Sequence, residues 1–180
     1  MSSRNILTII LILAVATTWY LIPDPPPSQQ KTAQQTDYFV VKLNRKQMNL
    51  SGDTASTFSA DRVDHYPEDN REELIKPRAT TYSAEDPPWN LSADEGTLWE
   101  EEDRVTMRGN VIANQKFPKS PRFSRMETEE AELFLDSNSM KTDKLITFTT
   151  DRTTTTSTGA ELHLDTGEIH LLKSSSGHYK

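Results

Sequence analysis

The sequence contains no cysteine, which excludes thiol catalysis, disulfide bonds and cysteine-based zinc sites. It is also short of basic residues: the net charge is -7 at pH 7, whereas nucleic-acid binders need basic surface to displace counterions from phosphates. We therefore expect no nucleic-acid partner. Hydrophobic residues make up only 34% of the chain, and many of them fall within the first 22 positions. The remainder is thinly apolar, with a length that suits one domain with a core of its own.

Catalytic motifs are missing as well. The sequence has no nucleophile motif, no phosphate-binding loop and no HExxH motif. Its carboxylates are scattered and define no pair of general acid and general base. We expect a protein that is not an enzyme, with no catalytic residues and no cofactor.

Only one long hydrophobic run is present, residues 6–22 (ILTIILILAVATTWYLI), which carries no charge and is just long enough to span a bilayer. A cleaved signal peptide is one interpretation, because Ala14-Val15-Ala16 has the small-x-small form of a cleavage site. An uncleaved anchor is favoured, because the run continues past Ala16 and includes the interfacial pair Trp19-Tyr20. Arg4 before the run and an acidic domain after it predict that residues 1–5 are cytoplasmic and the domain lies outside.

A polar spacer separates this run from the domain. Residues 23–37 contain four prolines, at positions 23, 25, 26 and 27, followed by SQQKTAQQT. Proline stops the helix, and the polar residues have nothing to bury. We expect a domain over residues 38–180, with Tyr38 to Leu43 as a possible first strand and a turn at Gly52-Asp53.

The stretch Trp89 to Asn114, WNLSADEGTLWEEEDRVTMRGNVIAN, predicts two paired strands. Apolar or small residues in its first arm are spaced by two, then three, then two positions. Side chains alternate along a strand, so one extra residue keeps them on one face only if the backbone bulges or turns a corner. The second arm alternates apolar and mostly polar residues from Val105 to Ala113. The four glutamate and aspartate residues at 100–103 predict an exposed hairpin tip.

The two-three-two step recurs in four places, which indicates a repeat architecture. The second member of each copy is a small residue. These four residues lie 33, 35 and 29 positions apart along the chain: Ala60, Ala93, Thr128 and Ser157. The first and last copies are the weakest, as expected for terminal repeats that have one neighbour instead of two. The copies are Phe58, Ala60, Val63, His65; Leu91, Ala93, Gly96, Leu98; Met126, Thr128, Ala131, Leu133; and Thr155, Ser157, Ala160, Leu162.

The pattern W-x-L-x-A-x-x-G-x-L-(x6)-V-x-M-x-G-N-V, from Trp89 to Val111, resembles the signature of the LptC family of lipopolysaccharide export proteins and the OstA-type repeat that they share with their partners. The resemblance also covers the N-terminal anchor, the spacer and the glycines Gly52, Gly109 and Gly159, which we assign to turn or edge positions. Arg108 departs from the family, in which an aromatic residue can stand at that position.

The resemblance implies a V-shaped antiparallel β-jellyroll of stacked repeats in the periplasm, preceded by one transmembrane helix in the cell inner membrane. It implies transfer of lipopolysaccharide from an inner-membrane ABC transporter of the LptB, LptF and LptG type to a bridge protein of the LptA type. We expect the helix and the edge near residues 38–43 to meet the transporter. The C-terminal edge, after the hairpin Ala160 to Leu172, is expected to receive the bridge protein, because an open sheet edge pairs readily. The alternative is an anchored scaffold that joins proteins through sheet edges and carries no lipid.

The in-facing rows of the strands are the candidate binding residues. Such rows usually form an ordinary sealed core, whereas the resemblance implies a groove for acyl chains. Small residues among them would leave room for a chain. The candidates for the groove lining are Phe58, Ala60, Val63, Leu91, Ala93, Leu98, Val105, Met107, Val111, Met126, Ala131, Leu133, Leu135, Leu162, Leu164, Ile169 and Leu171.

The segment FPKSPRFSR and the lysine before it form a basic loop in an acidic protein, which suits either lipid phosphates or an ordinary solvated loop. The basic residues of this loop are Lys116, Lys119, Arg122 and Arg125.

The last hairpin brings two histidines together. If Thr166-Gly167 is a two-residue hairpin loop, Leu164 faces Ile169, Leu162 faces Leu171, and His163 lies opposite His170. Two imidazoles and a carboxylate suit zinc, but no second shell is visible, so we predict no metal site.

Overall fold

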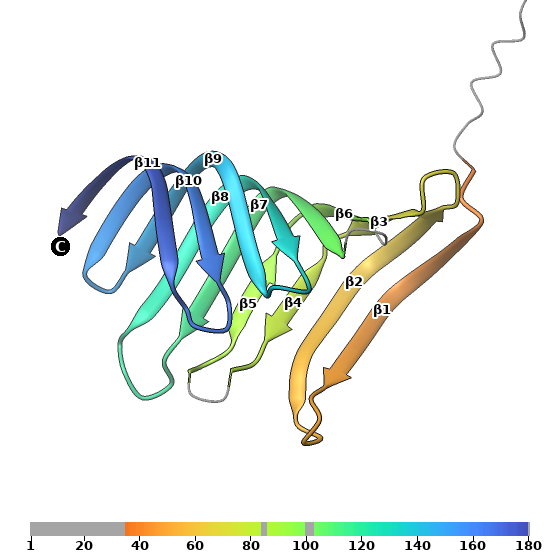
Figure 1. The fold of residues 1–180 in the computed structure, drawn as a ribbon, viewed down its shortest axis with the longest axis horizontal. Coiled ribbons are helices and arrows are strands. Elements are labelled where there is room, and N and C mark those ends of the chain that lie inside the picture. The colour runs from red at the N-terminus through yellow and green to blue at the C-terminus, as the bar shows by residue number, and fades with distance from the viewer. Residues whose placement is uncertain (1–34, 84–85, 100–102, 180) are drawn as a thin grey trace, which may run out of the picture. The chain divides into compact units, whose positions relative to one another are not determined.

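The protein is described here by a computed structural model that covers residues 35–83, 86–99 and 103–179. Within these ranges every regular element is a β-strand, and the strands join into one antiparallel sheet (Figure 1), which confirms the all-β prediction. The predicted anchor and residues 100–102 of the predicted hairpin tip lie outside the described ranges. No helix in the described part of the chain is long and apolar enough to cross a membrane. The strands are β1 Tyr38–Met48, β2 Thr54–Tyr66, β3 Arg71–Ile75, β4 Arg78–Thr81, β5 Trp89–Ser92, β6 Glu95–Trp99, β7 Arg104–Lys116, β8 Phe123–Phe134, β9 Ser139–Thr150, β10 Thr153–His163 and β11 Ile169–Tyr179.

The strands follow one another across the sheet in chain order. β2 pairs with both β3 and β4, and β7 pairs with both β5 and β6, so each of these short pairs forms two parts of one long strand. β8 to β11 then continue the sheet as consecutive antiparallel neighbours. This order needs only short connections, and β-branched threonine, abundant in β9 and β10, favours the extended backbone.

The long strands turn a corner near their middle. The register of β7 shifts at Gly109 and Asn110, whose φ angles are 72° and 46°. The register of β8 shifts between Thr128 and Glu132, and that of β10 shifts around Gly159. The shifts place one extra residue in β7, where Arg108 to Val111 lies opposite Glu130 to Thr128, and one in β9, where Leu145 to Thr142 lies opposite Thr158 to Ala160, and such an insertion bends a strand. In the repeat strands β8 and β10 the predicted three-residue step is confirmed by burial, because the repeat members on both sides of the corner are buried: Met126, Ala131 and Leu133 in β8, and Ser157, Ala160 and Leu162 in β10.

The strands between the repeats use a different step. Buried or partly buried side chains in β9 follow a two-four-two spacing, at Met140, Thr142, Ile146 and Phe148. β7 has the same spacing, because the bulge at Gly109 and Asn110 takes up the additional residues. The sequence thus alternates three-residue and four-residue corners from one strand to the next.

The corners divide the sheet into two halves. We call half A the part that contains β4 and β5, and half B the part that contains β3 and β6, each with the strand segments aligned beside them. Rim A consists of the turns at the free end of half A, and rim B of those at the free end of half B. Rim A comprises residues 49–53, 82–83, 86–88, 117–122 and 151–152, and rim B comprises residues 67–70, 103, 135–138 and 164–168.

Side chains from both halves form a single apolar core. All of its members are at most 7% exposed, and full burial of a large aliphatic side chain contributes roughly 1.5–3 kcal/mol. Contacts also cross from one rim to the other, because Ser83 Oγ of rim A lies 3.5 Å from the backbone oxygen of Asp165 in rim B. The core residues are Ala60, Val63, Leu74, Trp89, Leu91, Ala93, Val105, Met107, Val111, Ala113, Met126, Ala131, Leu133, Met140, Ile146, Ala160, Leu162 and Leu164.

Candidate functional site

The structure brings most of the predicted lining residues into this core. Those buried within it are Ala60, Val63, Leu91, Ala93, Val105, Met107, Val111, Met126, Ala131, Leu133, Leu162 and Leu164. Phe58, Leu98, Ile169 and Leu171 are partly buried and pack against it. Leu135 differs: it follows the last residue of β8, lies in rim B and is 44% exposed. Alternation along a strand does not extend into the turn that follows it.

The core also contains residues that the lining prediction omitted. Trp89 belongs to the central signature but was not assigned to the interior, and it is 1% exposed. Ala160 belongs to the fourth repeat copy but was left out of the lining set. The others lie on strands between the repeats, where the longer corner hides the periodicity. A search for two-four-two spacing finds Met140 and Ile146. The omitted residues are Leu74, Trp89, Ala113, Met140, Ile146 and Ala160.

The composition of the core makes it adaptable. Three methionines, Met107, Met126 and Met140, are no more than 2% exposed, and methionine fits irregular spaces because its side chain is unbranched and polarisable. Alanines at 60, 93, 113, 131 and 160 alternate with these large side chains. A core of this kind can repack around a guest more easily than one of interlocking β-branched residues.

The core reaches both ends of the strand stack. At the first end, Leu43, Phe58 and Ala79 are partly buried against it, and at the other end Phe148, Ile169 and Leu171 take this position. Beyond them, β1 and β11 each pair with a single neighbour among the described strands. Both edges therefore present backbone groups that another strand can pair with.

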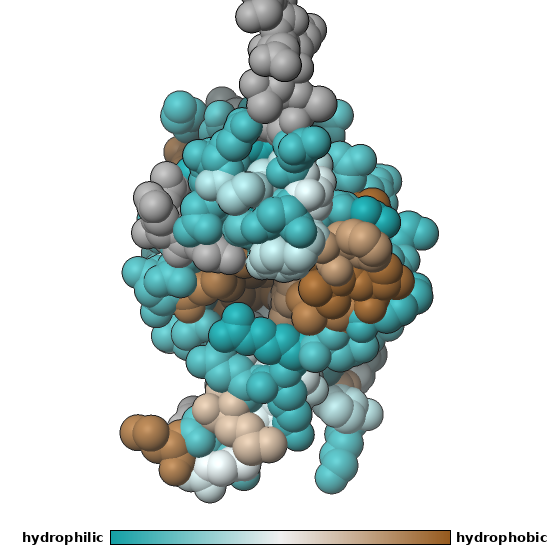
Figure 2. Space-filling view, turned by 90° about the vertical axis from the view of Figure 1, so that its right-hand side faces the viewer, coloured by the Kyte–Doolittle hydropathy of each residue, from teal (hydrophilic) through white to brown (hydrophobic). Residues whose placement is uncertain are grey.

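The β1 edge is the more apolar of the two. Figure 2 looks at this side of the molecule and shows apolar side chains gathered beside a recess. Phe39 and Val41 are 59% and 56% exposed, and Tyr38 and Val40 are 44% and 37% exposed. Exposed aromatic and aliphatic side chains on an edge strand are typical of an interaction surface.

The Lys42–Asp61 ion pair joins β1 to β2, and an ion pair within β2 holds an arginine against the β1 residue Phe39. Arg62 donates two hydrogen bonds to Asp64, of 2.7 and 2.5 Å, and its guanidinium lies 4.6 Å from the ring centroid of Phe39. The hydrogen bond from Arg62 lowers the pKa of Asp64, and a hydrogen bond from Lys42 lowers the pKa of Asp61. Asp37 Oδ1 lies 2.6 Å from His65 Nδ1, and this contact lowers the pKa of Asp37.

The outer face of half B is covered by charged side chains. Arg104 and Glu132 form an ion pair, and Arg108 Nε donates to Glu130 Oε2 at 2.8 Å. Thr97 and Thr106 point to this outer face, yet they are only 9% and 6% exposed. An outward position in this region is therefore not a solvent-exposed one.

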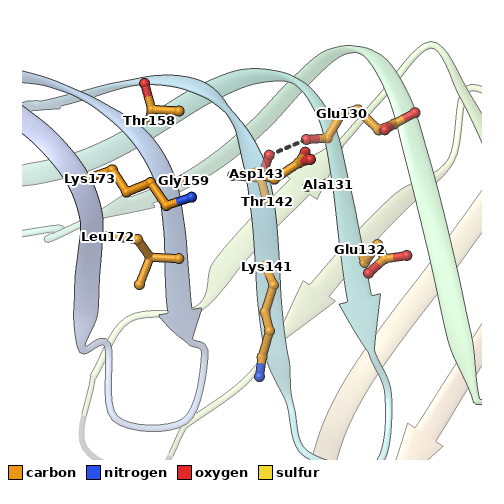
Figure 3. A pocket seen from close by; sticks show the side chains of 10 residues that line it. All are labelled: Glu130, Ala131, Glu132, Lys141, Thr142, Asp143, Thr158, Gly159, Leu172 and Lys173. Carbon is orange, nitrogen blue, oxygen red and sulfur yellow. Dashed lines mark hydrogen bonds between the residues drawn. The ribbon is translucent and has the colours of Figure 1, made fainter.

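A surface pocket of about 430 Å³ lies on the outer face around the corners of β8 to β11 (Figure 3). Its lining mixes acidic residues such as Glu130 and Asp143 with lysines such as Lys141 and Lys173. Thr142 Oγ1 donates to the backbone oxygen of Glu130 at 2.6 Å across the bulge. This charged surface does not resemble the apolar interior predicted to bind a lipid.

The C-terminal hairpin has a different register from the one predicted. Leu162 pairs with Ile169, Ala160 with Leu171, and Glu161 with His170, so the predicted two-residue loop at Thr166-Gly167 is wrong. Threonine is unsuited to the positive φ that such a loop requires. The chain instead forms a longer loop in which Gly167 has a φ of 70° and donates to the His163 carbonyl at 2.8 Å.

The two histidines consequently lie diagonally across the strands. Their ring centroids are 5.9 Å apart, and the rings are nearly perpendicular. His163 Nε2 lies 3.4 Å from Glu161, and His170 Nε2 lies 3.8 Å from Glu168. Among the described residues, no group of three or more histidine, aspartate or glutamate side chains is placed to hold a metal ion.

The predicted basic loop forms the β7–β8 turn of rim A. Arg125 of β8 is paired with Glu127 at 2.8 Å, a hydrogen bond that raises the pKa of Arg125. Lys116, Lys119 and Arg122 are exposed, and none of them forms an ion pair with a carboxylate of the described chain. The Arg122 guanidinium lies 4.3 Å from the centroid of the Phe117 ring.

Comparisons with known proteins agree with this architecture. A family model described as "LptC: Lipopolysaccharide-assembly, LptC-related" matches residues 7–180. No curated protein matches the sequence. Among solved structures, the chain is similar in fold to LptH from Pseudomonas aeruginosa, described as the LptA homologous periplasmic component of the conserved lipopolysaccharide transport device. The TM-score is 0.51 at 12% sequence identity, over 66% of this chain and 82% of that one.

Proposed function

Because the chain belongs to the LptC family of lipopolysaccharide-assembly proteins, we propose that it is the membrane-anchored relay of the export machinery. Family membership assigns it a role in lipopolysaccharide transport. In this proposal residues 6–22 anchor it in the inner membrane and the described sheet lies in the periplasm. The domain accepts lipopolysaccharide from an ABC transporter of the LptB, LptF and LptG type and passes it to an LptA-type bridge protein without catalysing a reaction.

The observation that carries the proposal is the continuity of the apolar core from one edge strand to the other. Leu43 and Phe58 extend it to the β1 end, and Ile169 and Leu171 extend it to the β11 end. An acyl chain that replaces side-chain contacts along this path stays out of water throughout its passage. Each buried CH₂ contributes about 0.8 kcal/mol, so part of one chain already binds with several kcal/mol.

Because the core is filled by side chains of both halves, a lipid can enter it only if half A and half B separate. The methionines and alanines of the core allow side chains to repack around an acyl chain as rim A separates from rim B. The contact between Ser83 and Asp165 at 3.5 Å is long for a hydrogen bond, so its loss costs little free energy. Binding of this kind is reversible, as a relay requires.

The proposal also gives the relay a direction, which the difference between the two edges supports. The transporter's periplasmic domain pairs with β1, where Phe39 and Val41 add apolar contact area. The bridge protein pairs with β11, which follows β10 at the opposite end of the sheet. Strand addition at both edges joins the apolar cores of successive proteins into one path.

Photo-crosslinking at two adjacent leucines tests the proposal. Leu171 packs against the core, whereas Leu172 lies on the outer face and is 56% exposed. A photoreactive side chain at Leu171 in the full chain, assembled with the transporter, should give an ATP-dependent adduct with lipopolysaccharide. The same group at Leu172 should give none. Equal adducts at both positions, or none at Leu171 while the complex still assembles, would contradict the proposal.

A scaffold without lipid is the second candidate, because the core is closed and both edges are open for pairing. A scaffold requires the edges but not the interior. It therefore predicts that complex assembly continues and that lipid adducts are missing from every core position, including Phe58 and Leu171.

A further inference from the structure

The two rims carry different charges. The described residues of rim B include Glu68, Asp69, Asp103, Asp136, Asp165 and Glu168, and they include no lysine or arginine. Arg71 and Arg104, which begin the strands after two of these turns, are already paired with carboxylates. Rim A is acidic or balanced at its other turns, whereas its β7–β8 turn contains Lys119 and Arg122 and no acidic residue. Its strand-end neighbour Lys116 adds a third cation.

The β7–β8 turn holds its cations on an ordered backbone. Phe117 donates to the carbonyl of Arg122 at 3.2 Å, and Ser120 donates to the carbonyl of Phe117 at 3.1 Å. The Arg122 amide donates to Ser120 Oγ at 3.2 Å. Two prolines, at positions 118 and 121, restrict the turn further. Cations that are already positioned and lack an anionic partner lose little entropy when they bind one.

The β7–β8 turn lies next to the rim A end of the apolar core. Ala113 and Met126 are cross-strand partners, 0% and 1% exposed. Each lies three residues along its strand from the pair next to the turn, Lys116 and Phe123. Three residues of a strand span about 10 Å. An amphiphile with its chain in the core therefore brings its headgroup to the level of this turn (Figure 1, lower left).

A buried hydrogen-bond donor lies at the same end of the core, next to rim A. Trp89 pairs across the strands with Gln115, the residue before Lys116. Its indole Nε1 is buried and has no acceptor among the described residues. A buried donor without a partner is uncommon. The Gly167 turn of rim B lies close to this nitrogen, because a Cβ added at Gly167 would be 3.9 Å from it.

We propose that the β7–β8 turn and Trp89 form the headgroup site of the relay, with Lys119 and Arg122 binding a phosphate of the lipid and the Trp89 N–H donating to an acyl carbonyl. The inference rests on the proposed function, since it places the polar end of the same lipid. Phosphate is bound by lysine as a point charge and by arginine through paired N–H groups. The acidic rim B repels the headgroup, so the lipid enters in one orientation, with its phosphate at rim A.

Binding to bisphosphorylated and to dephosphorylated lipid A, measured with the full chain in detergent, tests the site. The wild type should bind the phosphorylated lipid at least about ten-fold more tightly. The double variant Lys119→Gln/Arg122→Gln should lose this preference and keep the affinity for the dephosphorylated lipid. The matched control Lys76→Gln/Arg78→Gln removes one exposed lysine and one exposed arginine at the β3–β4 corner, on neither edge strand, and should behave as wild type.

The outcomes separate the two proposals. Equal affinity of the wild type for both lipids, or equal losses in the two double variants, would overturn the headgroup site and leave the relay intact. Failure to bind either lipid would overturn the relay itself. Inorganic phosphate that binds the chain as tightly as the phosphorylated lipid would also overturn the site, because a free anion would then be its ligand.

Trp89→Phe tests the indole separately. The substitution removes a buried N–H without an acceptor and keeps an aromatic ring, so the unfolding midpoint should stay the same or rise. The affinity for both lipids should fall by a similar factor, because the carbonyl is present in each. A lower unfolding midpoint with unchanged lipid affinity would show that Trp89 serves only the packing of the core.

Discussion

At the scale of single residues, the corners depend on backbone conformations that few side chains adopt. Gly109 has a φ of 72°, and a Cβ added there would lie 2.9 Å from Asp94 Oδ2 and 3.1 Å from Asp94 Cβ. The Asp94 carboxylate accepts a hydrogen bond of 2.6 Å from Asn110 Nδ2, and the Asp94 amide donates to the Gly109 carbonyl at 2.9 Å. The close approach of β7 to the β5–β6 corner thus requires a residue without a side chain.

We predict that Gly109→Ala lowers the free energy of unfolding by about 2–3 kcal/mol. The left-handed backbone costs a non-glycine residue roughly 1–2 kcal/mol, and displacement of Asp94 disrupts a hydrogen bond worth about 1 kcal/mol. Gly52→Ala is the matched control, because its φ is 85° but a Cβ there meets nothing within 4 Å. Urea denaturation should show a smaller loss for Gly52→Ala, and equal losses would contradict the packing argument.

At the scale of elements, the two edge strands are held in different ways. β1 is exposed along nearly its whole length, with only Leu43 partly buried. Its attachment includes the Arg62–Asp64 pair beneath Phe39, the Lys42–Asp61 pair and the contact between Asp37 and His65. β11 is similarly exposed and places only Ile169 and Leu171 against the core.

We predict that β1 loosens in acid before the central strands do. Asp37, Asp61 and Asp64 each have a pKa lowered by the hydrogen bond of a basic partner. Because the folded-state pKa lies below the unfolded value, the stabilisation is complete above about pH 4 and is lost as the pH falls through the lowered values. Native-state hydrogen exchange should show protection in β1 decreasing as the pH falls below about 4, while β8 stays protected. Parallel loss in β1 and β8 would refute this.

We predict that removal of β11 alone abolishes binding to the bridge protein and keeps the transporter bound. Deletion of residues 169–180 removes two partly buried apolar side chains. Deletion from residue 160 onward would also remove Ala160, Leu162 and Leu164, which are at most 2% exposed, and would damage the fold. Co-purification should recover the transporter with the shorter deletion. Capture of the bridge protein by the folded truncation, or loss of the transporter first, would reverse the proposed polarity.

At the scale of the whole molecule, the repeat spacing was enough to predict the all-β fold, the three-residue corners and most of the core. Alternation along Met126 to Leu133 has a direct physical meaning, because a strand with one extra residue has to bend. The four-residue corner of β9 has no small residue of the kind that identifies the repeats, so the repeat spacing does not predict that Met140 and Ile146 belong to the core. The register of the last hairpin depends on the loop that Gly167 permits, which apolar matching alone does not determine.

Other features depend on contacts between distant parts of the chain. Thr106 has the alternation of an outward residue, but Arg104, Arg108 and their glutamate partners come from the same face and leave it only 6% exposed. The approach of the Asp165 turn to Ser83 brings together residues far apart in sequence. The spacing of residues within one strand does not predict contacts between the two rims. The closure of the core by side chains of both halves therefore could not be predicted from the sequence pattern.

The central claim is that the two halves part to admit a lipid, and a reversible disulfide across the rims tests it most directly. The chain has no cysteine, so Ser83→Cys/Asp165→Cys introduces the only possible bridge, at a place where the two residues already touch. Asn114→Cys/Arg125→Cys is the control, because these cross-strand partners both belong to half A. Lipopolysaccharide binding to the full chain is measured with each pair oxidised and then reduced. The account predicts that oxidation of the cross-rim pair abolishes binding, that reduction restores it, and that the control binds in both states. Undiminished binding to the fully oxidised cross-rim pair would contradict it.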